Sequence, residues 1–223
     1  MPSVRGVHDR LRRRARRAGV SLPPELLSGL TAYLEFLARW NARINLTAFD
    51  LSDPTDEAID RLLIEPLVAV QELKLQPGRL VDIGSGSGSP AIPIKLARPE
   101  SSLVMVEAKT RKAVFLVEAS RHLNLSSVSV ETARFESLLT RPEFREAFDT
   151  LTIRAVRVES RVLVSLQAFL RPGGRLLWFR SLGRGSGALD APYPLAWERS
   201  LTLLEERGSG LVVLKKEGVA AGV

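Results

Sequence analysis

The chain has 223 residues, 45% of them hydrophobic and 26% charged, a composition typical of a soluble globular protein with one sizeable domain. It contains no cysteine, which excludes disulfides, thiolate chemistry and the commonest structural zinc sites, so no metal ion is expected. No apolar run approaches the roughly 20 residues that span a bilayer, and no apolar segment of a secretory signal follows the N-terminal arginines. We therefore expect a cytoplasmic enzyme with no membrane partner.

The formal net charge of +7 is concentrated at the N-terminus. Residues 1–17 contain seven arginines and one aspartate, so this segment carries +6 and leaves about +1 for the rest of the chain. Such a segment attracts polyanions, and RNA is the obvious candidate. The alternative is a solvated helix face rich in arginine. We treat residues 1–20 as a basic N-terminal arm.

A helical extension is expected next, over residues 21–76. Ser21 before two prolines is a reasonable helix start, with a capping hydroxyl followed by prolines in the first turn. Apolar residues spaced by three and four then draw one stripe along this helix. After a turn, a second helix is expected over residues 55–73. The stripe consists of Leu26, Leu30, Leu34, Leu37 and Trp40.

From residue 77 onward short apolar runs alternate with helical segments, which predicts an α/β domain with a doubly wound, mostly parallel sheet over residues 77–223. Residues 201–217 hold two apolar runs around an Arg-Gly-Ser-Gly turn, which predicts a closing hairpin with an antiparallel C-terminal edge strand. The other expected strands cover residues 79–84, 102–108, 128–133, 148–156 and 173–181, and the expected helices cover 109–125, 135–147 and 159–171.

The segment at residues 82–88 reads acidic-x-Gly-x-Gly-x-Gly directly after the first expected strand. A P-loop is excluded because Gly88 is followed by Ser-Pro rather than by a lysine and a Ser or Thr. The dinucleotide fingerprint needs a glycine where Ser89 stands. Glycine lets the backbone turn tightly and approach a ligand without a Cβ in the way. A tight turn without a ligand is the alternative.

A second acid, Glu107, ends the second expected strand, 19 residues after Gly88. Nucleotide-binding α/β folds place an acid about 20 residues on, where it accepts hydrogen bonds from ribose hydroxyls. Two acids and no phosphate partner suit S-adenosylmethionine (SAM), which has a ribose and an ammonium group but no phosphate. A solvated strand end is the alternative for Glu107.

Five segments stand out by their order and spacing: FLARWNARINLTAFD, VDIGSGSGSPAIPIKLARPE, VEAKTRKAVFL, ARFESL and IRAV. In these segments the chain resembles the RsmG (GidB) family, from about Leu26 to Leu214. The W-N-x-x-x-N-L-T and glycine-loop segments are specific in combination. The resemblance implies a Rossmann-like class I SAM-dependent methyltransferase. It also implies a reaction, methylation of ring nitrogen 7 of a guanine in 16S ribosomal RNA, with the small ribosomal subunit as partner.

The resemblance also implies site residues. Arg154, in IRAV, matches an arginine near the cofactor, where a guanidinium can hold the methionine carboxylate by a bidentate pair. Arg154 and Arg180 are the candidate catalytic residues, expected to orient the guanine. The adenine end of the cofactor is expected where the third strand ends. The candidate cofactor-binding residues are Asp82, Gly84, Ser85, Gly86, Gly88, Ser89, Glu107, Ala108, Arg134, Phe135, Glu136 and Arg154.

Three segments depart from the family's usual pattern. RLLIEPL at residues 61–67 replaces a His followed by L-D-S, Ala91 replaces the glycine of P-G-I-P, and Arg180 replaces a lysine. These departures cluster where substrate is expected to bind. Two alternatives therefore stay open: a catalytically silent RNA- or ribosome-binding relative, and a SAM-dependent methyltransferase for another substrate.

The expected reaction needs no general base, because nitrogen 7 of guanine bears a lone pair and no proton. It needs in-line positioning of both partners. This agrees with a chain of two histidines, of which His8 lies in the basic arm and His122 is expected to be structural. Nothing in the sequence demands more than a monomer.

Overall fold

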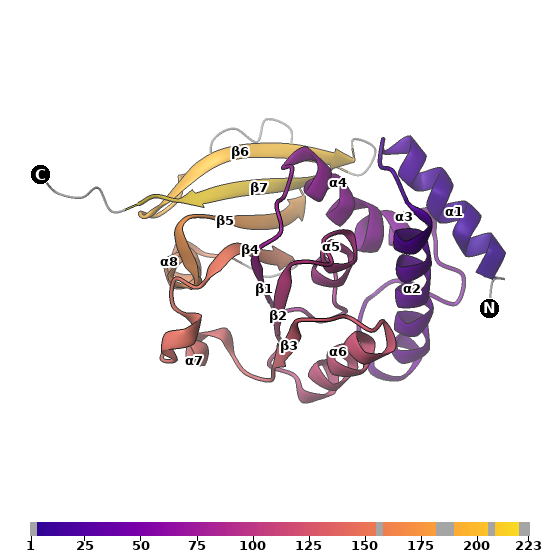
Figure 1. Ribbon diagram of the computed structural model, residues 1–223, viewed down its shortest axis with the longest axis horizontal. Helices are drawn as coiled ribbons and strands as arrows, with labels where there is room; N and C mark the ends of the chain where they lie inside the picture. The colour runs from indigo at the N-terminus through magenta and orange to yellow at the C-terminus, as the bar shows by residue number, and fades with distance from the viewer. Residues whose placement is uncertain (1–3, 155–157, 182–189, 205–207, 219–223) are drawn as a thin grey trace, which may run out of the picture.

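The computed structural model describes residues 4–154, 158–181, 190–204 and 208–218. Among these residues, seven strands form one sheet in the order β3-β2-β1-β4-β5-β7-β6 (Figure 1). Strands β1 to β5 pair in parallel, and β7 is antiparallel to both of its neighbours. The strands are β1 (Arg79–Ile83), β2 (Ser102–Val106), β3 (Val128–Glu131), β4 (Phe148–Arg154), β5 (Leu170–Ser181), β6 (Leu195–Leu204) and β7 (Ser209–Lys216).

Helices cover both faces of this sheet, which confirms the predicted doubly wound α/β fold. Successive side chains of a strand point to opposite faces, so Leu80 packs into one hydrophobic cluster and Val81 into the other. The α-helices are α1 (Val4–Arg17), α2 (Pro24–Ile44), α3 (Asp56–Ile59), α4 (Glu65–Glu72), α5 (Ala91–Ala97), α6 (Thr110–His122), α7 (Phe135–Leu138) and α8 (Ser160–Leu166). The remaining helical turns are the π-helical η1 (Asp60–Ile64) and the 3₁₀ turns η2 (Pro142–Phe144) and η3 (Gln167–Phe169).

The predicted C-terminal hairpin forms from β6 and β7 and closes the sheet with an antiparallel edge strand, which confirms that part of the prediction. β7 lies between β5 and β6, and β6 is the edge strand. The reason is that β7 buries apolar side chains on both faces, as Val212 and Val213 show, whereas most side chains of β6 stay partly exposed. Arg207 of the predicted turn, and Ala155 and Val156 of the predicted fourth strand, lie outside the described residues.

The helical extension and the segment after the glycine loop differ from prediction in three details. The N-cap of α2 is Pro23 rather than Ser21, and Pro24 at the first helical position has no N–H to satisfy. The predicted second helix divides into α3, η1 and α4, with the Thr55 hydroxyl capping its start. The short helix α5 was not predicted, because prolines at positions 90 and 93 hide its periodicity. The apolar stripe of α2 is confirmed, with Leu30, Leu34 and Leu37 buried.

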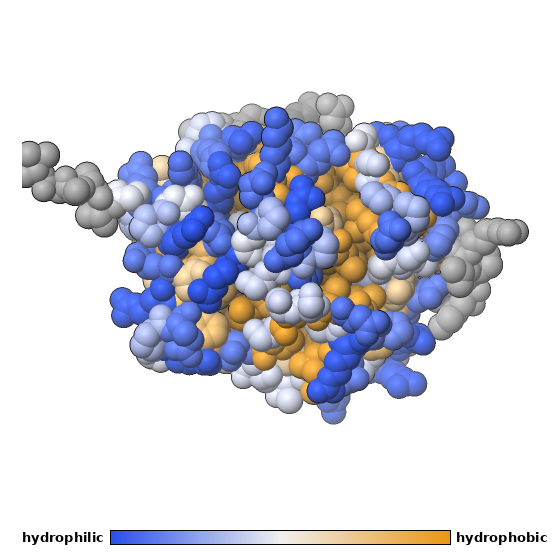
Figure 2. Space-filling view, in the orientation of Figure 1, coloured by the Kyte–Doolittle hydropathy of each residue, from blue (hydrophilic) through white to orange (hydrophobic). Residues whose placement is uncertain are grey.

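The predicted basic arm forms helix α1, which packs against the extension. Val7, Leu11 and Ala15 are buried on its inner side. The buried guanidinium of Arg14 donates to both carboxylate oxygens of Asp60, at 2.8 and 2.5 Å. The outer side is hydrophilic in the space-filling view (Figure 2, upper right). Arg12, Arg13, Arg16 and Arg17 are exposed there. Residues 4–17 are therefore a docked helix with an arginine-rich outer face.

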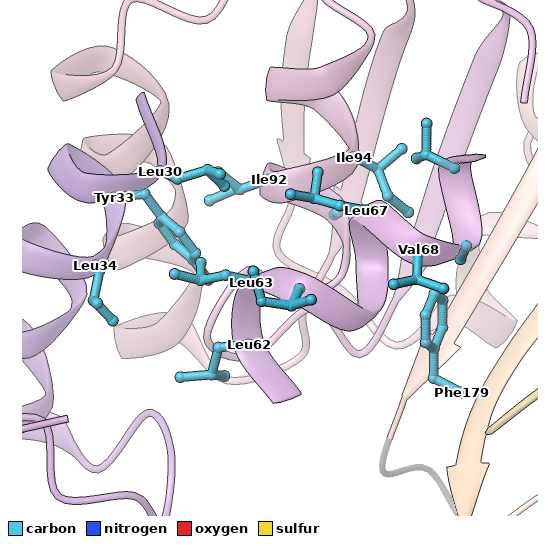
Figure 3. Close-up of a cluster of buried hydrophobic side chains, with 14 of the residues drawn as sticks. Leu30, Tyr33, Leu34, Leu62, Leu63, Leu67, Val68, Ile92, Ile94 and Phe179 are labelled. Carbon is cyan, nitrogen blue, oxygen red and sulfur yellow. The ribbon is translucent and has the colours of Figure 1, made fainter. Parts of the chain in front are cut away.

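The extension and one face of the sheet share a single hydrophobic cluster (Figure 3). Leu30 of α2 lies toward Ile92 of α5, and Val68 of α4 lies toward Phe179 of β5. All four side chains are buried. The core therefore continues across the predicted boundary at residue 76. Within the described part of the chain, no helix is both long and apolar enough to cross a membrane.

Replacement of Arg14 by alanine is expected to lower the free energy of unfolding by about 3 kcal/mol, because it removes the cation that faces a fully buried carboxylate. The matched change Arg13→Ala, on the exposed side of the same helix, should cost less than about 0.5 kcal/mol. Urea unfolding followed by circular dichroism measures both. Equal effects would show that the Arg14–Asp60 pair does not dock α1.

Candidate functional site

A cavity of about 1130 Å³ opens at the carboxyl ends of the central parallel strands, where α/β sheets bind ligands. The glycine loop forms one part of its wall, and a loop of the helical extension forms another. Among the described residues that line it, five side chains are cationic and Glu107 alone is acidic. The lining segments are residues 46–49, 61–62, 84–87 and 178–181, together with Ser89, Glu107, Lys109, Lys112, Arg154 and Val158.

The three glycines of the loop all have positive φ, of 73° at Gly84, 50° at Gly86 and 88° at Gly88. A Cβ on Gly88 would lie 2.6 Å from Cδ1 of Ile92 in α5, and the positive φ would strain any other residue, so this position favours glycine. A Cβ on Gly86 would meet only the Gly84 carbonyl oxygen, at 3.7 Å. The space beside Gly86 therefore belongs to the cavity, and a ligand there can approach the backbone closely, as the sequence predicts.

Glu107 follows β2 and braces the glycine loop. Its Oε2 accepts a hydrogen bond from the amide of Gly86 at 3.0 Å, and its Oε1 accepts one from the amide of Lys109 at 2.8 Å. Each carboxylate oxygen can accept a further bond. Glu107 lines the cavity, so its free lone pairs suit the two hydroxyls of a ribose, as predicted for SAM.

Asp82 is buried beneath the loop rather than in the cavity wall. Its Oδ1 accepts a hydrogen bond from the Thr152 hydroxyl at 2.5 Å, while Oδ2 has no hydrogen-bond partner among the described residues. Burial raises the pKa of Asp82 to about 6, although Thr152 and the nearby Arg154 act in the opposite direction. The acid of the motif therefore lies in the protein interior below the loop.

Two hydrogen bonds tie the glycine loop to the helical extension. The Ser89 hydroxyl donates to the carbonyl of Leu62 in the π-helical turn η1, at 2.7 Å. The buried Tyr33 hydroxyl, from α2, donates to the carbonyl of Ser87, also at 2.7 Å. The Ser89 hydroxyl is thus already hydrogen-bonded to the extension. Its partner Leu62 lies in a π-helical turn, a feature frequent at functional sites. Tyr33 was not predicted as a site residue.

Arg154 ends β4 and meets two groups of the extension. Its guanidinium lies 3.2 Å from the buried Glu65 carboxylate and donates to the carbonyl of Arg61. It also lies 4.6 Å above the centre of the Phe179 ring. Burial lowers the pKa of Arg154 to about 10, opposed by Glu65, so the side chain stays charged at neutral pH. Its carboxylate partner is therefore Glu65 of the chain itself, and its role toward a cofactor stays a prediction.

The cavity brings together seven of the predicted site residues and leaves out six. Arg180 lines it from the end of β5, with its guanidinium 4.4 Å above the Trp178 ring. Arg134 and Glu136 are exposed at the start of α7, outside the cavity wall, and their role at the adenine stays a prediction. The residues that line it are Gly84, Ser85, Gly86, Ser89, Glu107, Arg154 and Arg180; those that do not are Asp82, Gly88, Ala108, Arg134, Phe135 and Glu136.

Sequence reasoning missed the part of the wall that comes from residues 46–49, and also Lys109 and Lys112 of the α6 end. A signal was present, because the W-N-x-x-x-N-L-T segment that carries the family resemblance includes Leu46 and Thr47. The segment is typical of the family, but its spacing alone does not place it at the cavity.

Asp82 makes the free energy of unfolding depend on pH. Its pKa rises from 3.8 to about 6 on folding, so its contribution is present below pH 4 and is lost as pH rises through about 6. The stability of the wild type relative to Asp82→Asn should therefore fall by up to about 3 kcal/mol between about pH 4 and pH 7. Urea unfolding of both proteins measures this difference. A pH-independent difference would contradict the raised pKa of the buried Asp82.

The chain is similar in sequence to known proteins over most of its length. The family model described as GidB, rRNA small subunit methyltransferase G, matches residues 26–185. The ribosomal RNA small subunit methyltransferase G of Syntrophotalea carbinolica is 36% identical over 171 residues, which is 77% of this chain and 76% of that relative. That of Leuconostoc mesenteroides is 32% identical over 181 residues, which is 80% of this chain and 75% of that relative.

Solved structures show the fold alone. A SAM-dependent methyltransferase from Aquifex aeolicus has a TM-score of 0.52 at 14% identity and covers 70% of this chain and 92% of its own. A variant of MtNAS in complex with S-adenosylmethionine has a TM-score of 0.56 at 14% identity, over 95% of this chain and 98% of its own. The fold is thus the predicted Rossmann-like class I methyltransferase fold. Because the family model covers most of the chain, the protein belongs to the GidB family of rRNA small subunit methyltransferases.

Proposed function

We propose that the protein is a SAM-dependent methyltransferase that methylates ring nitrogen 7 of a guanine in 16S ribosomal RNA. The observation that carries this proposal is one cavity in which a glycine loop braced by Glu107 meets a wall of cationic side chains. Family membership supports the same reaction. The free space beside Gly86 and the two acceptor oxygens of Glu107 fit SAM, which supplies an electrophilic methyl group when bound.

The residues of the chain act on the guanine by position rather than by proton transfer. No histidine is among the described residues that line the cavity, and His122 stacks on Phe36 with ring centres 4.6 Å apart. Because nitrogen 7 of guanine has a lone pair and bears no proton, transfer of the methyl group that SAM would supply needs no base among the residues of the chain. In this proposal Arg180 orients the guanine, and Arg154, paired with Glu65, holds the extension against the sheet.

The charge distribution supports RNA as the partner. Arg61, Lys112 and Arg180 bring positive charge to the cavity from three different segments, and the outer face of α1 adds more. The cytoplasm, a monomeric state and the small ribosomal subunit as substrate are parts of the same proposal. So is the division into residues 1–20, 21–76 and 77–223. A silent RNA-binding relative is the second candidate, since residues 61–67 and 180 depart from the family pattern.

The proposed reaction is tested on small ribosomal subunits from a strain that lacks this family's enzyme. The subunits are incubated with the protein and methyl-labelled SAM, and the digested RNA is analysed by mass spectrometry. We expect labelled 7-methylguanosine at a single site. Absence of label while SAM still binds would favour the silent relative, and label on another nucleoside or on protein would point to another substrate.

The arginines on the outer face of α1 should contribute to RNA affinity through counterion release. The triple change of Arg12, Arg13 and Arg16 to glutamine should weaken RNA binding and reduce the slope of log affinity against log salt by about 2. Because α1 is docked through its inner side, these changes leave the fold intact, whereas deletion of residues 1–17 would uncover the hydrophobic cluster against which α1 packs.

The matched control replaces three exposed arginines elsewhere, Arg121, Arg145 and Arg171, by glutamine. It removes the same charge from other parts of the surface. Fluorescence anisotropy at several salt concentrations measures both variants. The same slope in the two triple variants would contradict a specific role for α1.

A further inference from the structure

The loop at residues 46–49, called here the wall loop, lines the cavity together with the glycine loop and Arg180. It follows α2 and so belongs to the helical extension, not to the sheet. The cofactor fit described above uses none of its residues. The wall loop therefore lines the site, but binding of the cofactor does not explain its presence there.

One side chain shapes the wall loop. Oδ1 of Asn41 accepts hydrogen bonds from the amides of Leu46 and Thr47, at 2.8 and 2.9 Å, and its Nδ2 donates to the carbonyl of Phe49 at 3.1 Å. Asn45 ends α2 in the left-handed region, with φ of 51°, which allows the chain to turn back toward Asn41. The loop thus receives its conformation from the last turn of the helix before it.

The base of the wall loop is fixed to the rest of the protein. Trp40, next to Asn41, packs edge-on against Phe115 of α6 with ring centres 5.8 Å apart, and Phe36 stacks on the same ring at 5.9 Å. Helix α6 begins at Thr110, between the two lysines of the cavity wall. The C-terminal part of α2 is therefore held against α6. The wall loop is organised before any ligand binds, which lowers the entropic cost of binding.

The chemistry of the wall loop differs from that of the neighbouring wall. Leu46 is buried as an anchor, Ala48 is exposed, and Thr47 and Phe49 are half-buried. None of the four is charged, whereas Arg61, Lys112 and Arg180 supply cations from other segments. A neutral surface with a hydroxyl and an aromatic ring suits an unstacked base or its sugar better than a phosphate.

We propose that the wall loop contacts the target nucleotide of the RNA substrate, and that Asn41 is the positioning residue that sets its conformation. The inference rests on the proposed function and adds the part of the chain that recognises the nucleotide. The cationic segments then hold the flanking phosphates, and the glycine loop and Glu107 hold SAM.

The first test places a charge on the wall loop. Ala48→Glu adds bulk and a carboxylate at an exposed position of the cavity, and Ala42→Glu adds the same group at an exposed position of α2 outside it. We expect Ala48→Glu to weaken RNA binding and raise KM for RNA by about tenfold or more, with Kd for SAM within about twofold of wild type. Ala42→Glu should resemble the wild type in all three.

The second test removes the hydrogen bonds of Asn41. Asn41→Ala loses all three, whereas Asn41→Asp keeps an acceptor for the amides of Leu46 and Thr47 and loses the donor to Phe49. We expect a rise of about tenfold in KM for RNA with alanine and a smaller rise with aspartate, while Kd for SAM stays within about twofold. A purely structural role would shift RNA and SAM binding together with the unfolding midpoint.

The possible results separate the inference from the proposed function. If the wild type methylates RNA and Ala48→Glu behaves like Ala42→Glu, the wall loop does not contact the nucleotide and the inference is wrong, while the function stands. If Ala48→Glu weakens SAM binding as much as RNA binding, the wall loop belongs to the cofactor and the inference is also overturned. If the wild type neither binds nor methylates RNA, the proposed function fails and the inference fails with it.

Discussion

The buried ion pair between Arg154 and Glu65 joins the two parts of the chain that form the cavity. Arg154 ends the central strand β4, and Glu65 begins α4 in the helical extension. Removing one partner of a buried pair typically costs about 3–5 kcal/mol, so the pair resists separation of the extension from the sheet. The hydrogen bonds from Tyr33 and Ser89 add two links across the same junction. The two walls of the cavity, one from the sheet and one from the extension, therefore keep fixed positions relative to each other.

This junction explains how a widely used fold acquires a particular substrate site. The sheet supplies the glycine loop and Glu107, which suit any bound nucleoside. The extension supplies Arg61 and the wall loop, which the cofactor does not require. Because the hydrophobic cluster is continuous between them, the extension is part of the same core rather than an added module. Substrate recognition is thus built into the folding of the whole chain.

Features that depend on local sequence could be predicted, and those that depend on distant partners could not. The glycine loop and Glu107 follow from spacing along the chain, and the structure gives each a physical reason. The place of β7 inside the sheet depends on which strands it pairs with, which the turn before it does not specify. The partner of Arg154 lies 89 positions away in the chain, in a segment that departs from the family pattern.

In the proposed function, one cavity between the sheet and the extension holds both the methyl donor and the guanine. A crystal structure of the protein with S-adenosylhomocysteine and a guanosine-containing RNA fragment would show whether it does. We expect the ribose hydroxyls on Glu107, and the thioether sulfur facing a guanine that lies between the wall loop and Arg180. Cofactor bound away from Glu107, or a guanine held outside the cavity, would contradict this proposal.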